Sequence, residues 1–148
     1  MITIGIDSGK SGGVAYMEND NIFMAHDLYP ISDMIGEIHQ FIHEHGRMKV
    51  RAVIEEPPSF IKMIPASRSF QMGVSFGECK GICQGALIQT ICLRPQVWQK
   101  GLTGLKGKQG PARKKGLKDH AFRLYPSLKP TLKTADAILL LHQSKHII

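Results

Sequence analysis

The chain of 148 residues has no apolar stretch of transmembrane length, and its N-terminus does not join a basic region to an apolar one. Cysteine is also scarce: Cys79, Cys83 and Cys92 form no CxxC pair, and their odd number argues against a disulfide framework. We therefore expect a soluble cytoplasmic protein with buried free thiols and no membrane partner. Its length fits a single domain over residues 1–148.

A phosphate-binding P-loop is missing as well, although the segment GIDSGKSGG at residues 5–13 contains GKS. A P-loop needs a glycine five positions before the glycine of GKS, and Ile4 stands there instead. Asp7 would also repel the phosphate that such a loop holds. We therefore expect no nucleotide cofactor, and we interpret Asp7 as a carboxylate at the end of an apolar strand.

Acidic residues are rare in the second half of the chain. Residues 1–78 carry six Lys or Arg against ten Asp or Glu, whereas residues 79–148 carry thirteen against two. No acid occurs from Cys79 to Lys118, and this stretch contains a glycine-rich basic segment at residues 105–118. Such a segment favours contact with a nucleic-acid backbone, the alternative being a solvated cationic loop kept for solubility.

The order of apolar runs and turn residues predicts an α/β fold. Strands are expected at residues 1–7, 13–17 and 21–28, and their short connections indicate an antiparallel meander. A helix that Ser32 can cap then returns the chain, so that a fourth strand at residues 49–55 lies parallel to the first. The later elements are a helix at residues 67–90, a strand at 88–93, helices at 95–98 and 112–124, and a last helix capped by Thr134. Together they form a five-stranded mixed sheet flanked by helices.

Glycine recurs at every fourth position of the long predicted helix, at Gly73, Gly77, Gly81 and Gly85. Each costs roughly 1 kcal/mol relative to alanine in an exposed helix, so the repeat indicates a face that another backbone approaches closely. The neighbour is either the sheet of the same chain, which we favour, or the same helix of a second subunit.

Two carboxylates are expected to meet at one edge of the sheet. Asp7 ends the first strand and Glu55 ends the fourth, and the carboxyl ends of parallel neighbours lie together. Asp136 lies in the first turn of the last helix, where favourable interaction with the helix dipole is an alternative explanation. Such carboxylates favour Mg²⁺ or Mn²⁺, and a pair of these ions can catalyse phosphodiester hydrolysis. Glu56 and Asp119 are candidates for an additional ligand, or they are solvent-facing acids.

Three segments carry a resemblance to a known family: IGIDSGKSGGVAY at residues 4–16, VIEEPPSF at residues 53–60 and TADAILLLH at residues 134–142. In this order and spacing they resemble the RNase H-like superfamily and, within it, the RuvC-type Holliday-junction resolvases. The resemblance implies an RNase H-like fold. It also implies a homodimeric, metal-dependent endonuclease that makes paired cuts in four-way DNA junctions.

The resemblance assigns roles to individual residues. Asp7, Glu55 and Asp136 would be the catalytic carboxylates and would bind two Mg²⁺ or Mn²⁺ ions. Many relatives have an acid or a histidine three residues before the last of these, where this chain has Lys133. The alternatives for that ligand are Glu56, Asp119 and His120. The expected DNA contacts are Lys106, Lys108, Arg113, Lys114, Lys115, Lys118 and Lys133.

Two other functions are compatible with the sequence. A nucleic-acid binding module without catalysis would have the same fold and the same basic segment. The GIDSGKSGG segment also resembles the first phosphate loop of actin-like and sugar-kinase ATPases, of which this chain would be only a fragment. Small size and a lysine-rich loop favour a bacterial or phage-infected cell as the setting.

Overall fold

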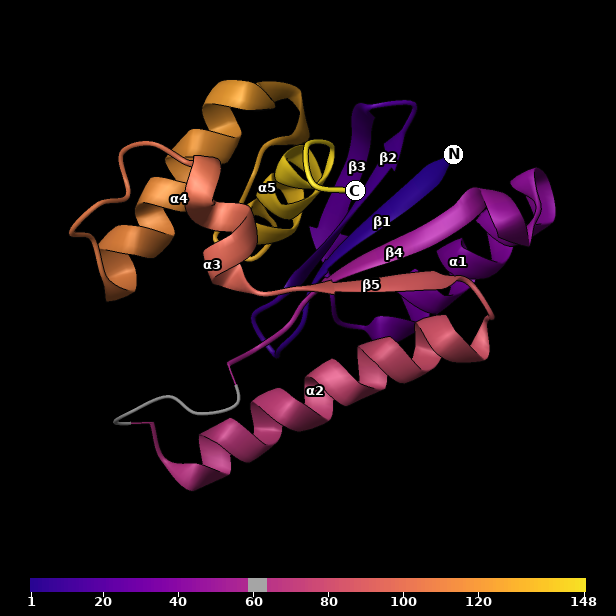
Figure 1. Ribbon diagram of the computed structural model, residues 1–148, viewed down its shortest axis with the longest axis horizontal. Coiled ribbons are helices and arrows are strands. Elements are labelled where there is room, and N and C mark those ends of the chain that lie inside the picture. The colour runs from indigo at the N-terminus through magenta and orange to yellow at the C-terminus, as the bar shows by residue number, and fades with distance from the viewer. Residues whose placement is uncertain (59–63) are drawn as a thin grey trace.

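Figure 1 shows a five-stranded mixed sheet at the centre of the computed structural model, which describes residues 1–58 and 64–148. The first three strands form an antiparallel meander, and the last two run parallel to the first, in the order β3-β2-β1-β4-β5. This arrangement confirms the predicted sheet. The last two residues of the VIEEPPSF segment lie outside the described residues. The strands are β1 (Ile2–Asp7), β2 (Gly13–Glu18), β3 (Asn21–Asp27), β4 (Val50–Glu55) and β5 (Gln89–Leu93).

Burial along the strands follows their place in the sheet. Every residue of β1 is buried, because strands lie on both sides of it and helices cover both faces. β3 is an edge strand and is largely exposed or half-buried. Asn19 and Asp20 form the tight turn between β2 and β3 with φ of 47° and 68°, a conformation that Asn and Asp tolerate well. The central, fully buried strand is therefore the one that delivers Asp7.

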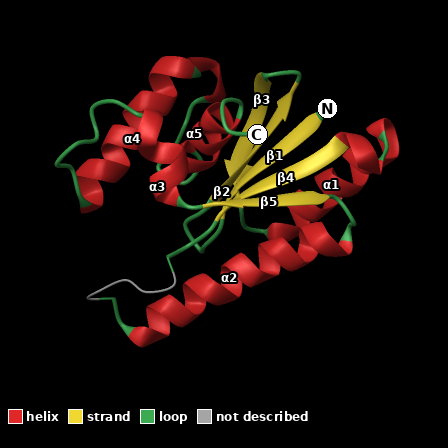
Figure 2. Cartoon of the chain, viewed as in Figure 1, coloured by secondary structure: helices red, strands yellow, loops and turns green. Residues whose placement is uncertain are grey.

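The two faces of the sheet carry different helices (Figure 2). α1 (Ile31–His45) and α2 (Ala66–Gly85) contribute to one apolar cluster, and α3 (Pro95–Trp98), α4 (Gly110–Leu124) and α5 (Ala135–Ser144) contribute to the other. Among the described residues, no helix is long and apolar enough to cross a membrane. The described part of the chain also contains three short 3₁₀ helices: η1 (Arg47–Lys49), η2 (Gln99–Gly101) and η3 (Pro126–Leu128).

Three predicted helix boundaries are wrong. One is the start of α4, which begins at Gly110 and not at residue 112, because Pro111 is tolerated in the first turn of a helix. α1 begins at Ile31 with Pro30 as its N-cap, so Ser32 lies inside the helix and does not cap it. The extended backbone of Pro30, with ψ of 133°, lets the helix begin directly after it. α2 ends at Gly85 and not in the following strand, because Leu87 adopts a left-handed φ of 57° that no helix continues.

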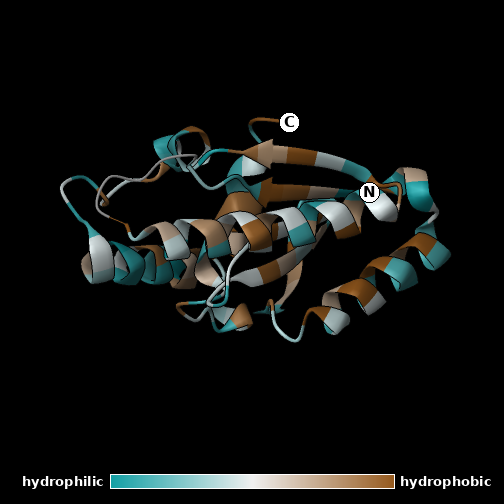
Figure 3. Cartoon of the chain, turned by 90° about the horizontal axis from the view of Figure 1, so that it is seen from below, coloured by the Kyte–Doolittle hydropathy of each residue, from teal (hydrophilic) through white to brown (hydrophobic). Residues whose placement is uncertain are grey.

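The glycine repeat of α2 does not pack against the rest of the described chain. A Cβ placed on any of the four glycines from Gly73 to Gly85 would meet nothing within 4 Å. The buried side of α2 is formed by Ser75, Cys79 and Cys83, which recur at the same spacing on another face. Packing of the glycines within the chain is therefore the wrong prediction, and they lie on an exposed side. Hydrophobic and hydrophilic residues are mixed along α2 in the view of Figure 3.

Two other glycines set α5 directly on the sheet. A Cβ on Gly13 would overlap the backbone carbonyl of Lys133, and a Cβ on Gly5 would lie 2.9 Å from the carbonyl oxygen of Ala137. Only glycine leaves room for these two contacts, so the start of α5 lies against β1 and β2. This close approach brings the first turn of α5 to the edge of the sheet where Asp7 lies.

Candidate active site

The carboxyl ends of β1 and β4 bring two acids together. In the parallel pair of β1 and β4, Ile6 lies opposite Ile54, so the next residues on the two strands are Asp7 and Glu55. Neighbouring strands are about 4.8 Å apart, which makes these two side chains direct neighbours. Asp7 is 9% exposed and Glu55 is half-buried. The structure thus places both acids at one edge of the sheet, as the strand pattern predicts.

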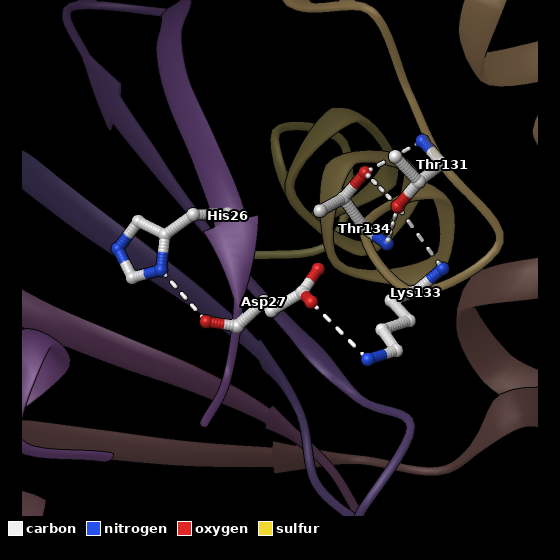
Figure 4. Close-up of polar contacts among 5 residues, drawn as sticks. All are labelled: His26, Asp27, Thr131, Lys133 and Thr134. Carbon is white, nitrogen blue, oxygen red and sulfur yellow. Dashed lines mark hydrogen bonds and ion pairs between the residues drawn. The ribbon is translucent and has the colours of Figure 1, made fainter. Parts of the chain in front are cut away.

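Asp136 enters the same site from the first turn of α5. The segment before the helix is held by two reciprocal hydrogen bonds, shown in Figure 4: the Thr131 N–H donates to Thr134 Oγ1 at 2.9 Å, and the Thr134 N–H donates to Thr131 Oγ1 at 3.2 Å. Thr134 is the N-cap residue, as predicted, but its side chain bonds this preceding turn and not the helix. Asp136 is 5% exposed, and its Oδ1 has no hydrogen-bond partner among the described residues.

The three carboxylates disturb one another electrostatically. Burial, followed by the charges of Asp136 and Glu55, raises the pKa of Asp7 well above its usual range. Burial and the charge of Asp136 raise the pKa of Glu55 to about 7. Such shifts arise when several acids share a poorly solvated site, and a bound cation would reverse them. The site therefore has more negative charge than its own residues balance.

Among the described residues, Lys114 is a cation that interacts with these acids. Its Nζ lies 2.6 Å from Asp136 Oδ2, and its charge lowers the pKa of both Asp7 and Glu55. Burial lowers the pKa of Lys114, but the three carboxylates outweigh that effect, so its pKa is raised and it stays protonated. Lys114 belongs to the predicted DNA-contacting segment, and no residue pattern in that segment predicts that α4 directs it into the acidic site.

Trp98 is a second residue that sequence analysis did not assign to the site. The indole Nε1–H donates a hydrogen bond to Glu55 Oε2 at 2.7 Å, and the side chain is fully buried. A buried indole N–H needs an acceptor, so the presence of a single tryptophan in the sequence was the available signal.

The chemistry of the three carboxylates fits a divalent cation, but their geometry does not form a closed set of ligands. Among the described residues, no three His, Cys, Asp or Glu side chains surround one point as a metal site. One oxygen of Asp136 is bonded to Lys114, and one oxygen of Glu55 is bonded to Trp98. The unpartnered Oδ1 of Asp136 and the raised pKa of Asp7 both indicate a site that a positive charge would stabilise.

The three candidates for an additional metal ligand, Glu56, Asp119 and His120, make other contacts or face solvent. The carboxylate of Glu56 forms an ion pair with Arg94 at 3.9 Å, and His120 Nδ1 lies 3.3 Å from Arg123 Nη2. Asp119 is exposed on α4, five residues after Lys114 and so about 140° around the helix from it.

Lys133 occupies the position where relatives of the resembled family have an acid or a histidine. Its Nζ lies 3.2 Å from Asp27 Oδ2 at the end of β3, as Figure 4 shows, and both side chains are about half exposed. The structure therefore pairs Lys133 with the edge of the meander and does not bring it to the three carboxylates.

The remaining basic residues lie around α4. Arg113 hydrogen-bonds Gln99, its neighbour in a surface pocket that also includes Lys100. The basic residues from Lys106 to Lys118 are called the basic surface below. α4 carries most of them and packs against α5, the helix that contributes Asp136 (Figure 1). Along the segment, Lys106, Lys108 and Lys115 are exposed, and Arg113 and Lys118 are half-buried.

Comparisons with known proteins agree with this architecture. No protein-family model matches the chain, and no curated protein sequence matches it. A structure of Thermus thermophilus RuvC with a Holliday-junction substrate matches at a TM-score of 0.58 and 16% identity, covering 97% of this chain and 91% of that one. Another Thermus thermophilus RuvC structure matches at a TM-score of 0.55 and 17% identity, covering 97% and 92%.

These matches, with the sheet order, define an RNase H-like α/β fold. More particularly, this chain has the fold of RuvC over nearly its whole length. The predicted fold class is thereby confirmed.

Proposed function

We propose that this chain is a metal-dependent nuclease that hydrolyses phosphodiester bonds in branched DNA, with the four-way junction as its substrate. The observation that carries the proposal is the convergence of Asp7, Glu55 and Asp136 in one buried site, with one carboxylate oxygen unpartnered among the described residues. The fold supports it, because one RuvC structure with the same fold holds a Holliday-junction substrate.

Asp7, Glu55 and Asp136 would hold Mg²⁺ or Mn²⁺, two ions in each site. When bound, such ions lower the pKa of an attacking water and offset charge on the scissile phosphate. Asp7 and Asp136 are buried and Glu55 is half-buried, which limits competition from solvent for the same oxygens. Lys114 balances part of their charge and lies where a DNA phosphate would approach from the basic surface.

The basic surface would hold the DNA. Lys106 and Lys108 before α4 and Lys115 on α4 are exposed, α4 packs against α5, and the second half of the chain carries the excess of basic residues. Phosphate contacts of this kind give affinity without base specificity. Recognition of a junction would then depend on its shape and on the spacing of two active sites.

A homodimer would supply that spacing, since paired cuts need paired sites. The exposed side of α2 supports this part of the proposal. Phe70 is 68% exposed and Val74 is 48% exposed, and the four open glycines lie on the same helix. We infer that α2 packs against α2 of a second copy, which is the alternative that sequence analysis kept open.

Cleavage of a synthetic four-way junction tests the function. The protein is incubated with the junction and with linear duplex of the same sequence, in Mg²⁺, in Mn²⁺ and in chelator, with Asp7→Asn alongside. We expect metal-dependent, paired nicks in the junction that the variant does not make. Intact substrates in both metals would sink the proposal, and equal cutting of both substrates would make the protein a nuclease without junction selectivity.

One observation favours a second function, a junction-binding module without catalysis. Lys114 already satisfies one oxygen of Asp136, as a permanent counter-ion would in an inactive site. Tight junction binding by a wild-type protein that never cuts, and binding unchanged by Asp7→Asn, would support that function.

A further inference from the structure

The only tryptophan of the chain bonds a proposed metal ligand. Trp98 is fully buried in the apolar cluster formed with α4 and α5, and its Nε1–H donates to Glu55 Oε2 at 2.7 Å. Filling the core does not by itself require a donor, because phenylalanine or leucine would serve there. The indole combines an apolar body with one directed N–H, and that N–H is aimed at the acidic site.

The fold explains why Trp98 reaches Glu55. β5 pairs in parallel with β4, and Leu93 lies opposite Glu55 in that register. Pro95 then begins the single turn of α3, which returns the chain over the carboxyl end of β4. Trp98 closes this turn, so its side chain is held by the sheet on one side and by the packing of α3 on α5 on the other.

The bond leaves one carboxylate oxygen of Glu55 available. Among the described residues, Oε2 is bonded to Trp98 and no partner is found for Oε1. A glutamate at a strand end has several rotatable bonds, and its free side chain samples many orientations. A rigid donor on one oxygen restricts the rotation of the carboxylate and thus the directions that the other oxygen can take. Outer hydrogen bonds of this kind orient metal ligands in many proteins.

We propose that Trp98 is a positioning residue that holds the carboxylate of Glu55 in the orientation that binds the divalent cation. This inference rests on the proposed function, because it concerns the same carboxylate site. Trp98 does not touch the ion or the DNA; it acts through Glu55.

Calorimetric titration with Mg²⁺ and with Mn²⁺ tests this role in Trp98→Phe, which keeps an aromatic ring and removes the N–H. Loss of an outer hydrogen bond to a metal ligand weakens metal affinity by about 10- to 100-fold, and we expect a loss in this range. Met17→Ala is the control, since Met17 is buried in the same cluster but lies opposite Thr3, at the far end of β1 from Asp7. That variant is expected to lose stability and to keep wild-type metal affinity.

The outcomes separate this inference from the proposed function. Failure of the wild-type protein to bind either ion, or binding that Asp7→Asn does not weaken, would contradict the proposed function. Wild-type binding with equal affinity in Trp98→Phe would overturn only the positioning role, as would an equal loss in Met17→Ala.

Fluorescence of the wild-type protein keeps the inference testable if Trp98→Phe does not fold. Trp98 is the only tryptophan, so its emission reports on this one position. We expect the emission to change on titration with Mg²⁺ and to saturate at the calorimetric affinity. Emission that stays constant while calorimetry shows Mg²⁺ bound would contradict the proposal.

Discussion

At the scale of single residues, the contact between Lys114 and Asp136 sets up a competition. The ammonium bonds Asp136 Oδ2 at 2.6 Å, an oxygen that a cation in the site would also need. We predict that Lys114→Met tightens Mn²⁺ binding about tenfold, because a charge-assisted hydrogen bond worth about 1.5 kcal/mol no longer has to be replaced. Calorimetry measures the change.

Lys115→Met is the matched control for this prediction, because Lys115 is the next residue on α4, is exposed like Lys114 and carries the same charge. Its loss is expected to change Mn²⁺ affinity far less. Equal tightening in both variants would show that Lys114 acts only through long-range charge, and no tightening in Lys114→Met would show that it does not compete with the ion.

A second residue-scale prediction concerns pH. Burial and the charge of Asp136 raise the pKa of Glu55 from 4.5 to about 7. The folded protein therefore binds more protons than the unfolded chain within this window, so the stability of the metal-free protein falls as pH rises through it. We predict that the free energy of unfolding of Glu55→Gln decreases less with rising pH, because glutamine does not titrate. A pKa difference of one between the folded and unfolded states corresponds to about 1.4 kcal/mol.

Urea denaturation in chelator, at several pH values across that window, measures the effect. Glu56→Gln changes the same charge at the next residue, whose carboxylate lies near Arg94, and is expected to keep the wild-type pH dependence. A slope in Glu55→Gln that matches the wild type would contradict the assignment of the raised pKa to Glu55.

At the scale of elements, the approach of α5 to the sheet positions the site. A Cβ on Gly13 would overlap the carbonyl of Lys133, just before α5. We predict that Gly13→Ala lowers the free energy of unfolding by about 1–3 kcal/mol, the usual effect of overpacking, and weakens metal binding by displacing Asp136. Urea denaturation and calorimetry measure the two effects.

Gly36→Ala is the control at this scale, because a Cβ on Gly36 meets nothing within 4 Å on the exposed side of α1. It is expected to stabilise the helix by up to about 1 kcal/mol. A Gly13→Ala variant as stable as the wild type would mean that α5 can shift without cost.

The sequence predicts the part of the site that depends on strand order, but not the part that depends on helix packing. Asp7 and Glu55 were placed together because parallel strand ends meet at one sheet edge, a consequence of local pattern and topology. The roles of Trp98 and Lys114 depend on how α3 and α4 pack over that edge, which no local pattern determines. The α2 glycines were placed on the wrong side because spacing defines a face but not its neighbour.

At the scale of the whole molecule, the two halves of the chain differ in charge. Residues 1–78 have more acidic than basic residues and form the meander and carry Asp7 and Glu55, whereas residues 79–148 have far more basic than acidic residues and supply the helices α3, α4 and α5 on one face of the sheet. Two copies joined through α2 would present two carboxylate sites. We predict that the wild-type protein is a dimer by size-exclusion chromatography with light scattering, and that Gly77→Arg makes it monomeric by filling the open side of α2.

The monomeric variant is expected to nick single strands of a junction without pairing the cuts. Gly36→Arg, which adds the same charge to an exposed glycine of α1, should remain a dimer. A wild-type protein that is monomeric at every concentration, or a Gly77→Arg dimer, would contradict the α2 interface.

The most direct test of the proposed metal centre is a crystal structure after soaking in Mn²⁺, with anomalous difference density calculated around β1, β4 and α5. We predict density bound by Asp7, Glu55 and Asp136, with the Lys114 ammonium moved away from Asp136 and Trp98 still bonded to Glu55. A map without density between the three carboxylates, with Lys114 still on Asp136 at saturating Mn²⁺, would contradict a metal-dependent active site and would favour a binding module.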